Sequence, residues 1–315
     1  METDRRVRRY RGSIARNKET TSHESGPARW RRVPGLLFGI AAAALAIVLA
    51  AVLLRPDSEP VGRGERERGP IHVHAIGVNP GDDALFIATH TGLFRLAPAA
   101  SKAQRVGDRY QDTMGFTVIG RDRFLGSGHP DLRDRQPSLL GLIKSKDGGE
   151  SWRPISLYGK ADFHILRARG PRLVGYDARH GRVMTSRDGG KAWSAYRFDG
   201  PLVDMVLAPG GRQLLATTPS QLILSRDGGR SWGGLSETTG LLAWPRQDRL
   251  YLLAPDGRLW LSPDRGKRWR GLGTIEDKPA AFVVNKGRMY AALHDGTIKA
   301  SNDNGLSWRR LAKPS

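Results

Sequence analysis

The chain has 315 residues, of which 39% are hydrophobic and none is cysteine. This apolar content suffices for a packed core, and the lack of cysteine excludes disulfide bonds and thiolate metal sites. The formal net charge is +20, but after residue 55 the arginines are scattered singly and are not interleaved with aromatic residues. The sequence therefore predicts no nucleic-acid groove.

The first predicted element is an uncharged apolar segment at residues 35–54, GLLFGIAAAALAIVLAAVLL. At about 1.5 Å per residue, a helix of this length spans about 30 Å, which is the thickness of a hydrocarbon core. We expect a single transmembrane helix. A cleaved signal peptide is the alternative, but the segment is longer than a usual signal-peptide core, and no convincing cleavage site follows it.

Residues 1–34 contain ten lysines and arginines against four acidic residues. The positive-inside rule predicts that these residues form a cytoplasmic tail, where anionic lipid accounts for the excess charge. The chain after the helix is then extracytoplasmic, and the predicted location is the plasma membrane. Residues 55–70 mix charges of both signs with glycine and proline, which is typical of a linker.

From residue 71 onward the chain is periodic. An octet of the form Ser-x-Asp-x-Gly-x-x-Trp occurs five times: SKDGGESW (145–152), SRDGGKAW (186–193), SRDGGRSW (225–232), SPDRGKRW (262–269) and SNDNGLSW (301–308). The tryptophans are 41, 39, 37 and 39 residues apart. A period of about forty residues predicts a repeat architecture.

The segments between octets read as short strands. FHILRARG, RLVGYDA, RVMTSRDGG and WSAYRF are four β-type runs separated by turn residues. Four strands in about forty residues correspond to one propeller blade. Residues 74–98 repeat the first three strands without an octet, so residues 71–315 are predicted to be an all-β, six-bladed β-propeller of four-stranded antiparallel blades.

The octets fall between the third and fourth strands, where the chain must reverse. Their aspartates can accept backbone N–H groups across the turn, their glycines allow a positive φ, and each tryptophan returns to the sheet and buries a large ring. We therefore interpret the octet as a folding device whose structural residues are Asp147, Trp152, Asp188, Trp193, Asp227, Trp232, Asp264, Trp269, Asp303 and Trp308.

The octet resembles the Asp-box, or BNR repeat. Five copies at blade spacing make the chain similar to the exported Asp-box propellers described as sialidase-like or glycosyl-hydrolase-like. Sortilin ectodomains and photosystem II assembly-factor propellers are more distant relatives. The resemblance implies that the octets lie on the face away from a ligand site, and it indicates the fold far better than the activity.

Candidate site residues gather at predicted positions of one face. In an antiparallel blade, the start of the first strand and the turn after the second strand lie on the same face, and in the first three blades these places hold an unusual set of polar residues. The set is His72, His74, His90, Asp112, Met114, His129, Asp131, Asp162, His164, Tyr176 and Asp177. Blades four to six offer little at these points, so we expect a site over one half of the ring.

Three functions compete for this face. Imidazoles with carboxylates suit a first-row metal, Met114 suits a softer one, and His72 and His74 point to the same side of one strand. The carboxylates could instead supply the acid pair of a glycosidase, with Tyr176 as a partner; the candidates are Asp112, Asp131, Asp162 and Asp177. A sialidase proper is disfavoured because the Phe/Tyr-Arg-Ile-Pro arginine is missing.

The favoured hypothesis is a non-enzymatic, membrane-tethered propeller that binds a ligand or protein partner over this face. In it, the ligand contacts would come from Asp112, His129, Asp131, Asp162 and His164. The long loop at residues 131–138, DLRDRQPS, could act as a movable flap.

Overall fold

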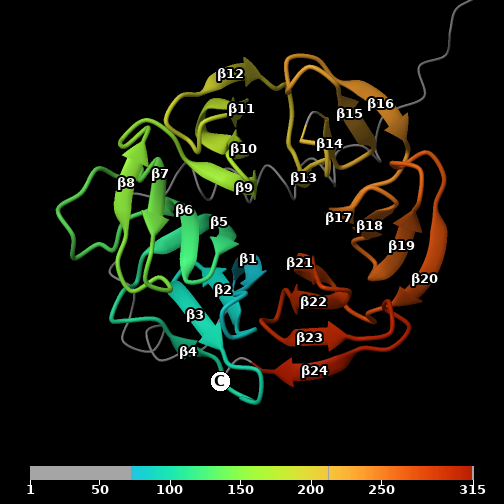
Figure 1. The fold of residues 1–315 in the computed structure, drawn as a ribbon, viewed down its shortest axis with the longest axis horizontal. Coiled ribbons are helices and arrows are strands. Elements are labelled where there is room, and N and C mark those ends of the chain that lie inside the picture. The colour runs from blue at the N-terminus through green and yellow to red at the C-terminus, as the bar shows by residue number, and fades with distance from the viewer. Residues whose placement is uncertain (1–71, 212, 314–315) are drawn as a thin grey trace, which may run out of the picture. The chain divides into compact units, whose positions relative to one another are not determined.

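The structure is a computed structural model that describes residues 72–211 and 213–313. Within these residues, 24 strands form six four-stranded antiparallel sheets that are arranged as blades around one axis (Figure 1). The predicted six-bladed propeller is confirmed. The expected tail, transmembrane helix and linker at residues 1–70 lie outside the described residues. Among the residues that are described, no helix combines the length and apolar character needed to cross a membrane.

Each blade is built from one continuous stretch of chain, with its strands in sequence order. Blades 1 to 3 contain β1 (Val73–Val78), β2 (Leu85–Thr89), β3 (Gly92–Leu96), β4 (Gln104–Arg105), β5 (Asp112–Gly120), β6 (Arg123–His129), β7 (Leu142–Ser145), β8 (Arg153–Ser156), β9 (Phe163–Arg169), β10 (Arg172–Asp177), the short 3-10 helix η1 (Ala178–His180), β11 (Arg182–Ser186) and β12 (Ser194–Arg197). Blades 4 to 6 contain β13 (Asp204–Leu207), β14 (Leu214–Thr217), β15 (Leu222–Ser225), β16 (Gly233–Ser236), β17 (Leu241–Arg246), β18 (Arg249–Leu253), β19 (Arg258–Ser262), β20 (Arg270–Thr274), β21 (Pro279–Asn285), β22 (Arg288–Leu293), β23 (Ile298–Ser301) and β24 (Arg309–Ala312).

The core of the propeller lies between the blades. Alternate side chains of a strand point to opposite faces, so Leu85 and Ile87 of β2 pack toward blade 6, whereas Phe86 and Ala88 pack toward blade 2. All five residues of β2 are buried. A strand that is covered on both faces must be apolar on both, which explains its continuous apolar run.

Within the described residues, the ring closes by side-chain packing, because no sheet contains strands from both ends of the propeller. The first strand of each blade is innermost, and β21 of the last blade lies beside β1 of the first (Figure 1). The apolar cluster at this junction joins Ile87 of blade 1 to Ala292 and Ile298 of blade 6. Both blades already have four strands of their own.

Each octet begins at the last residue of a third strand and ends just before the fourth strand. In the octet at 186–193, the Ser186 hydroxyl donates to Asp188 Oδ1 at 2.8 Å and accepts the Gly190 N–H at 2.9 Å. Asp188 Oδ1 also accepts the Ala192 N–H at 3.0 Å. The other four octets repeat this Ser–Asp–Gly pattern. The serine, to which sequence reasoning gave no role, is the centre of the turn.

The octet also attaches its blade to the preceding one. Gly190 has φ +89°, and a Cβ at this position would collide with Leu142 of β7 in blade 2. Trp193 packs on Phe163 of its own blade with ring centroids 5.0 Å apart, and its Nε1–H donates to the Ser156 hydroxyl of the preceding blade at 3.0 Å. The other octet tryptophans fill corresponding places between consecutive blades. Blade 1 has no octet, and among the described residues the cluster between blades 6 and 1 contains no tryptophan.

Candidate functional site

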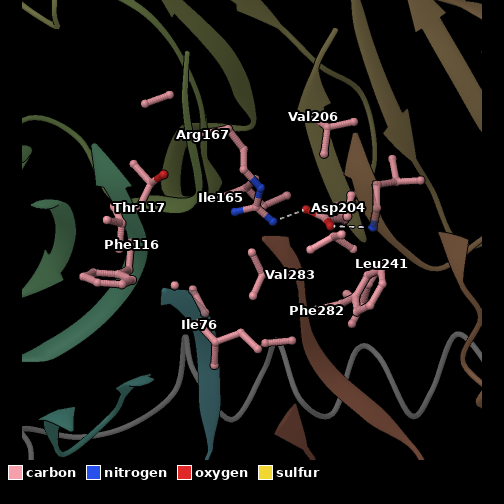
Figure 2. Close-up of a pocket in the computed structure, with 18 of the residues that line it drawn as sticks. Ile76, Phe116, Thr117, Ile165, Arg167, Asp204, Val206, Leu241, Phe282 and Val283 are labelled. Atoms are coloured by element: carbon pink, nitrogen blue, oxygen red, sulfur yellow. Dashed lines mark hydrogen bonds and ion pairs between the residues drawn. The ribbon is translucent and has the colours of Figure 1, made fainter. Parts of the chain in front are cut away.

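The innermost strands of all six blades surround a central cavity of about 550 Å³. Figure 2 shows apolar side chains lining it, among them Ile76, Phe116 and Phe282. His74 near the start of β1 and His164 near the start of β9 also line the cavity. Because the first strands run from this end toward the octets, both imidazoles lie at the end opposite the octets.

The first His–Asp cluster consists of His74, His90 and Asp112. His74 comes from β1, His90 follows β2, and Asp112 opens β5 of the next blade. His90 Nδ1 is 2.8 Å from Asp112 Oδ2, and His74 Nε2 is 3.4 Å from Asp112 Oδ1. The two imidazole rings meet edge-to-face with centroids 4.4 Å apart.

This cluster combines an ionised carboxylate with a neutral imidazole at neutral pH. Burial acts to raise the pKa of Asp112, but contact with His74 and His90 outweighs it and lowers that pKa to about 2. Burial is also the main influence on His74, where it lowers the pKa below the ordinary 6.5. The charged form of His74 is disfavoured even though a carboxylate is near.

The second His–Asp cluster consists of His129, Asp162 and His164. Asp162 Oδ2 is 2.9 Å from His164 Nε2 and 3.5 Å from His129 Nε2. The other ring nitrogen of His129 is 2.8 Å from the Ser138 carbonyl. Both nitrogens of His129 therefore face acceptors, which favours the doubly protonated ring.

Electrostatics in this cluster follow from that geometry. The interaction with Asp162 raises the pKa of His129 to about 9, so this imidazole is charged at neutral pH. Burial acts to raise the pKa of Asp162, but His129 and His164 more than offset it and the pKa falls below its usual range. The two clusters thus differ in charge: His129 is a cation, and His74 is not.

Both clusters arise from one topological rule. A histidine at the end of the second strand of one blade meets an aspartate at the start of the first strand of the next blade. His90 meets Asp112 in this way between blades 1 and 2, and His129 meets Asp162 between blades 2 and 3. The face over blades 1 to 3 is called here the His/Asp face, defined by these residues together with His74 and His164.

The remaining sequence-predicted residues lie outside the two clusters. His72 is exposed and packs its ring edge-on to His90, with centroids 5.6 Å apart. Met114 is half-buried in β5. Tyr176 lies between blades 3 and 4, where its hydroxyl donates to the Gly200 carbonyl at 3.3 Å.

Asp131 and Asp177 are buried carboxylates that form ion pairs within the protein. Asp131 is only 3% exposed, pairs with Arg133 at 2.6 Å, and accepts the Tyr110 N–H at 2.8 Å. Arg133 is the main cause of the lowered pKa of Asp131. Asp177 is fully buried and pairs with His180 and Arg182. The oxygens of both carboxylates therefore have partners within the protein, and the ligand contact expected of Asp131 stays a prediction.

The loop at residues 131–138, expected as a flap, is fastened to its surroundings. Arg133 pairs with Asp108 at 2.9 Å, and Arg109 pairs with Asp134 at 3.0 Å. The Tyr158 hydroxyl donates to Gln136 at 3.1 Å. These contacts, with that of the Ser138 carbonyl to His129, place the loop beside the His/Asp face.

Sequence reasoning missed three charged residues of the cavity. Arg167 pairs with Asp204 at 2.6 Å, and Asp204 also accepts the Leu242 N–H at 2.8 Å, so the contact joins blades 3, 4 and 5 (Figure 2). Arg169 reaches from blade 3 to the Trp244 carbonyl of blade 5 at 2.7 Å, at the octet end of the cavity. A lone carboxylate within the apolar run VDMVLA was the signal that could have revealed Asp204.

No protein-family model matches the chain, and no curated protein sequence matches it. Among solved structures, a chain of the nidogen/laminin complex is similar with a TM-score of 0.57 and 14% identity, over 73% of this chain and 93% of that one. An ancestral GH74 enzyme is similar with a TM-score of 0.51 and 12% identity, over 81% of this chain but only 40% of that one. YCF48 bound to the D1 peptide gives a TM-score of 0.48 and 16% identity, over 78% of this chain and 84% of that one. At these identities the likeness shows the propeller fold alone.

Proposed function

We propose that the chain is a membrane-anchored, extracytoplasmic propeller that binds a ligand or protein partner over its His/Asp face. The observation that carries this proposal is the meeting of two His–Asp clusters at one end of the cavity, over three consecutive blades. The octets occupy the opposite end. Loops of several blades surround one opening, which is a common setting for a binding site.

The face offers a partner two kinds of contact. His129 supplies a positive charge beside exposed imidazole surface, and the cavity behind it is lined with apolar side chains. A peptide or loop with a polar group next to an apolar side chain fits this combination. The propeller in the nidogen/laminin complex gives a precedent for a protein of this fold within a protein complex.

We further propose that the octets are Asp-boxes and that residues 35–54 anchor the propeller in the plasma membrane. The first is supported by the Ser–Asp–Gly hydrogen bonds in all five octets. The second is supported by the uncharged segment and the basic residues before it. Protease added to intact cells should digest the propeller and leave the basic tail protected.

A glycosidase is less well supported by the geometry. Such an enzyme needs one carboxyl group with a raised pKa to protonate the leaving oxygen. On the His/Asp face, the pKa values of both Asp112 and Asp162 are lowered by imidazoles. These two carboxylates are thus held as anions that accept hydrogen bonds.

Site-specific photo-crosslinking in membranes of the source cells tests the binding face. Leu132 of the 131–138 loop is 62% exposed, and Leu306 in the last octet is 69% exposed. Benzoylphenylalanine at Leu132 should form a discrete adduct, and the same probe at Leu306 should not. An adduct from Leu306 alone, or equal adducts from both positions, would place the binding surface elsewhere.

A further inference from the structure

We propose that His74, His90 and Asp112 bind one divalent first-row transition-metal ion, such as Zn²⁺. One ligand atom from each of the three side chains can be chosen so that all lie within 4.8 Å of one another. The three residues come from β1, the turn after β2, and β5, so the site joins blade 1 to blade 2. This inference does not depend on whether the His/Asp face binds a partner.

The ligand atoms of His74 and Asp112 are buried without a hydrogen bond. His74 Nε2 and Asp112 Oδ1 are closed off from solvent and make no hydrogen bond, although they face each other at 3.4 Å. Buried polar atoms in proteins almost always have a partner. Ligand atoms at 2.0–2.1 Å from a tetrahedral ion are about 3.3–3.4 Å apart, so an ion between these two atoms would satisfy both.

The donor set decides the class of ion. Two imidazole nitrogens and one carboxylate oxygen suit Zn²⁺, Cu²⁺ or Ni²⁺, whereas Mg²⁺ and Ca²⁺ prefer oxygen ligands alone. The third ligand is His90. Its Nδ1 is already 2.8 Å from Asp112 Oδ2, so only a small displacement would bring it to an ion bound by His74 and Asp112. Three protein ligands leave one position of a tetrahedral ion for water.

The second His–Asp cluster also has a buried oxygen without a hydrogen bond, Asp162 Oδ1, but its imidazoles contact the other oxygen of that carboxylate. Both of its imidazoles approach the same oxygen of Asp162, at 2.9 and 3.5 Å. His129 uses its remaining nitrogen on the Ser138 carbonyl, which requires a proton at that atom. His129 could then offer only Nε2 to a metal. Among the described residues, the side chains that bring one ligand atom each within 4.8 Å of one another are those of the first cluster. The proposed ion therefore belongs to the first cluster only.

Calorimetric titration of Zn²⁺ into the full-length, chelator-stripped protein, without a histidine tag, tests the site. We expect one ion per chain and no comparable binding of Mg²⁺. His90→Gln and Asp112→Asn should each weaken Zn²⁺ binding at least about tenfold. His90 is the primary position because its side chain is 46% exposed, so its replacement leaves the buried core intact.

Matched controls distinguish the site from general histidine binding. His294→Gln removes an exposed imidazole from blade 6, and His129→Gln removes one from the second cluster. Both should bind Zn²⁺ as the unchanged chain does. Visible absorption of bound Co²⁺ gives a readout of coordination that a loss of stability would not imitate. Absence of saturable binding, or equal binding by the His90→Gln variant, would overturn the proposal.

Discussion

The same residue type carries different charge at two places on one face. His74 lies among buried neighbours, which lowers its pKa below 6.5, whereas His129 faces Asp162 and the Ser138 carbonyl, and its pKa rises to about 9. Sequence spacing placed both residues on this face. It could not assign their charge, because the charge depends on which atoms surround each ring.

Nuclear magnetic resonance titration of the imidazole signals tests this assignment. We expect His129 to titrate near pH 9 and His74 below 6.5. Asp162→Asn should bring the pKa of His129 down by about one unit or more, toward the ordinary value, because its main cause is removed. A native His129 that titrates at or below 6.5 would contradict the geometry of the second cluster.

At the scale of the element, the octet glycine acts through packing as well as backbone conformation. Gly189 and Gly190 are adjacent and both have positive φ, +77° and +89°. An added Cβ at Gly189 meets nothing within 4 Å, whereas one at Gly190 collides with Leu142 of the preceding blade. Alanine at Gly189 would therefore test backbone strain in the turn alone, whereas alanine at Gly190 would test that strain together with the contact between blades.

We expect Gly189→Ala to lower the free energy of unfolding by about 1–2 kcal/mol, the cost of a left-handed alanine. Gly190→Ala should lower it by about 1–3 kcal/mol more, because the new methyl group overpacks the junction. Urea unfolding of the two variants measures the difference. Equal losses would mean that the octet is a turn only and does not attach one blade to the next.

The octet aspartates should make the propeller sensitive to acid. Hydrogen bonds, led by those from Ser231 and Arg268 respectively, lower the pKa values of Asp227 and Asp264 to about 2 from the ordinary 3.8. A carboxyl group whose pKa is lower in the folded chain stabilises it above pH 3.8, and this stabilisation is lost as the pH falls through about 2.

Asp264→Asn isolates one such contribution. The unchanged chain should melt at a higher temperature than this variant at neutral pH, and the gap should close between about pH 4 and pH 2. Circular dichroism melts across this range give the measurement. A gap that is the same at every pH would show that the charge of Asp264 does not stabilise the turn.

The elements were predictable because the octet marks one position in every blade. With that position known, strand order and the two ends of each blade follow, and so does the set of residues that share a face. The octet position does not reveal which aspartates of the candidate set are left without an arginine partner and so stay open to a ligand. Asp131 is occupied by Arg133, and Asp177 by Arg182, through contacts that depend on loop and turn paths without a period.

At the scale of the whole molecule, the ring closes where no octet contributes. The number of blades follows from the period, but the closing contact joins residues about two hundred positions apart, such as Asp83 and Lys286. The local sequence pattern does not predict such a pairing.

The closing junction can be compared with an internal one through two equivalent residues. Ile298 of β23 and Leu222 of β15 are each the first residue of a third strand, are fully buried, and face the next blade.

We expect Ile298→Ala and Leu222→Ala each to cost about 2–5 kcal/mol, within one cooperative unfolding transition. The reason is that both side chains are fully buried in an apolar cluster between two blades, one at the closing junction and one at an internal junction. Calorimetry of both variants provides the comparison. A much smaller loss of stability for Ile298→Ala, or a separate transition at lower temperature, would show that the packing between blades 6 and 1 contributes little to stability.

The central claim is that the His/Asp face binds the partner and that the octets at the other end stabilise the fold. The yield of the Leu132 photo-crosslink in two variants tests it most directly. In the chain with His90→Gln and His129→Gln, we predict that the yield falls at least about tenfold while the propeller stays folded at the assay temperature, as circular dichroism measures. In the Asp264→Asn chain, stability falls and the yield is retained. A crosslink that survives the loss of both imidazoles, or that disappears with the octet carboxylate in a folded chain, would contradict the account.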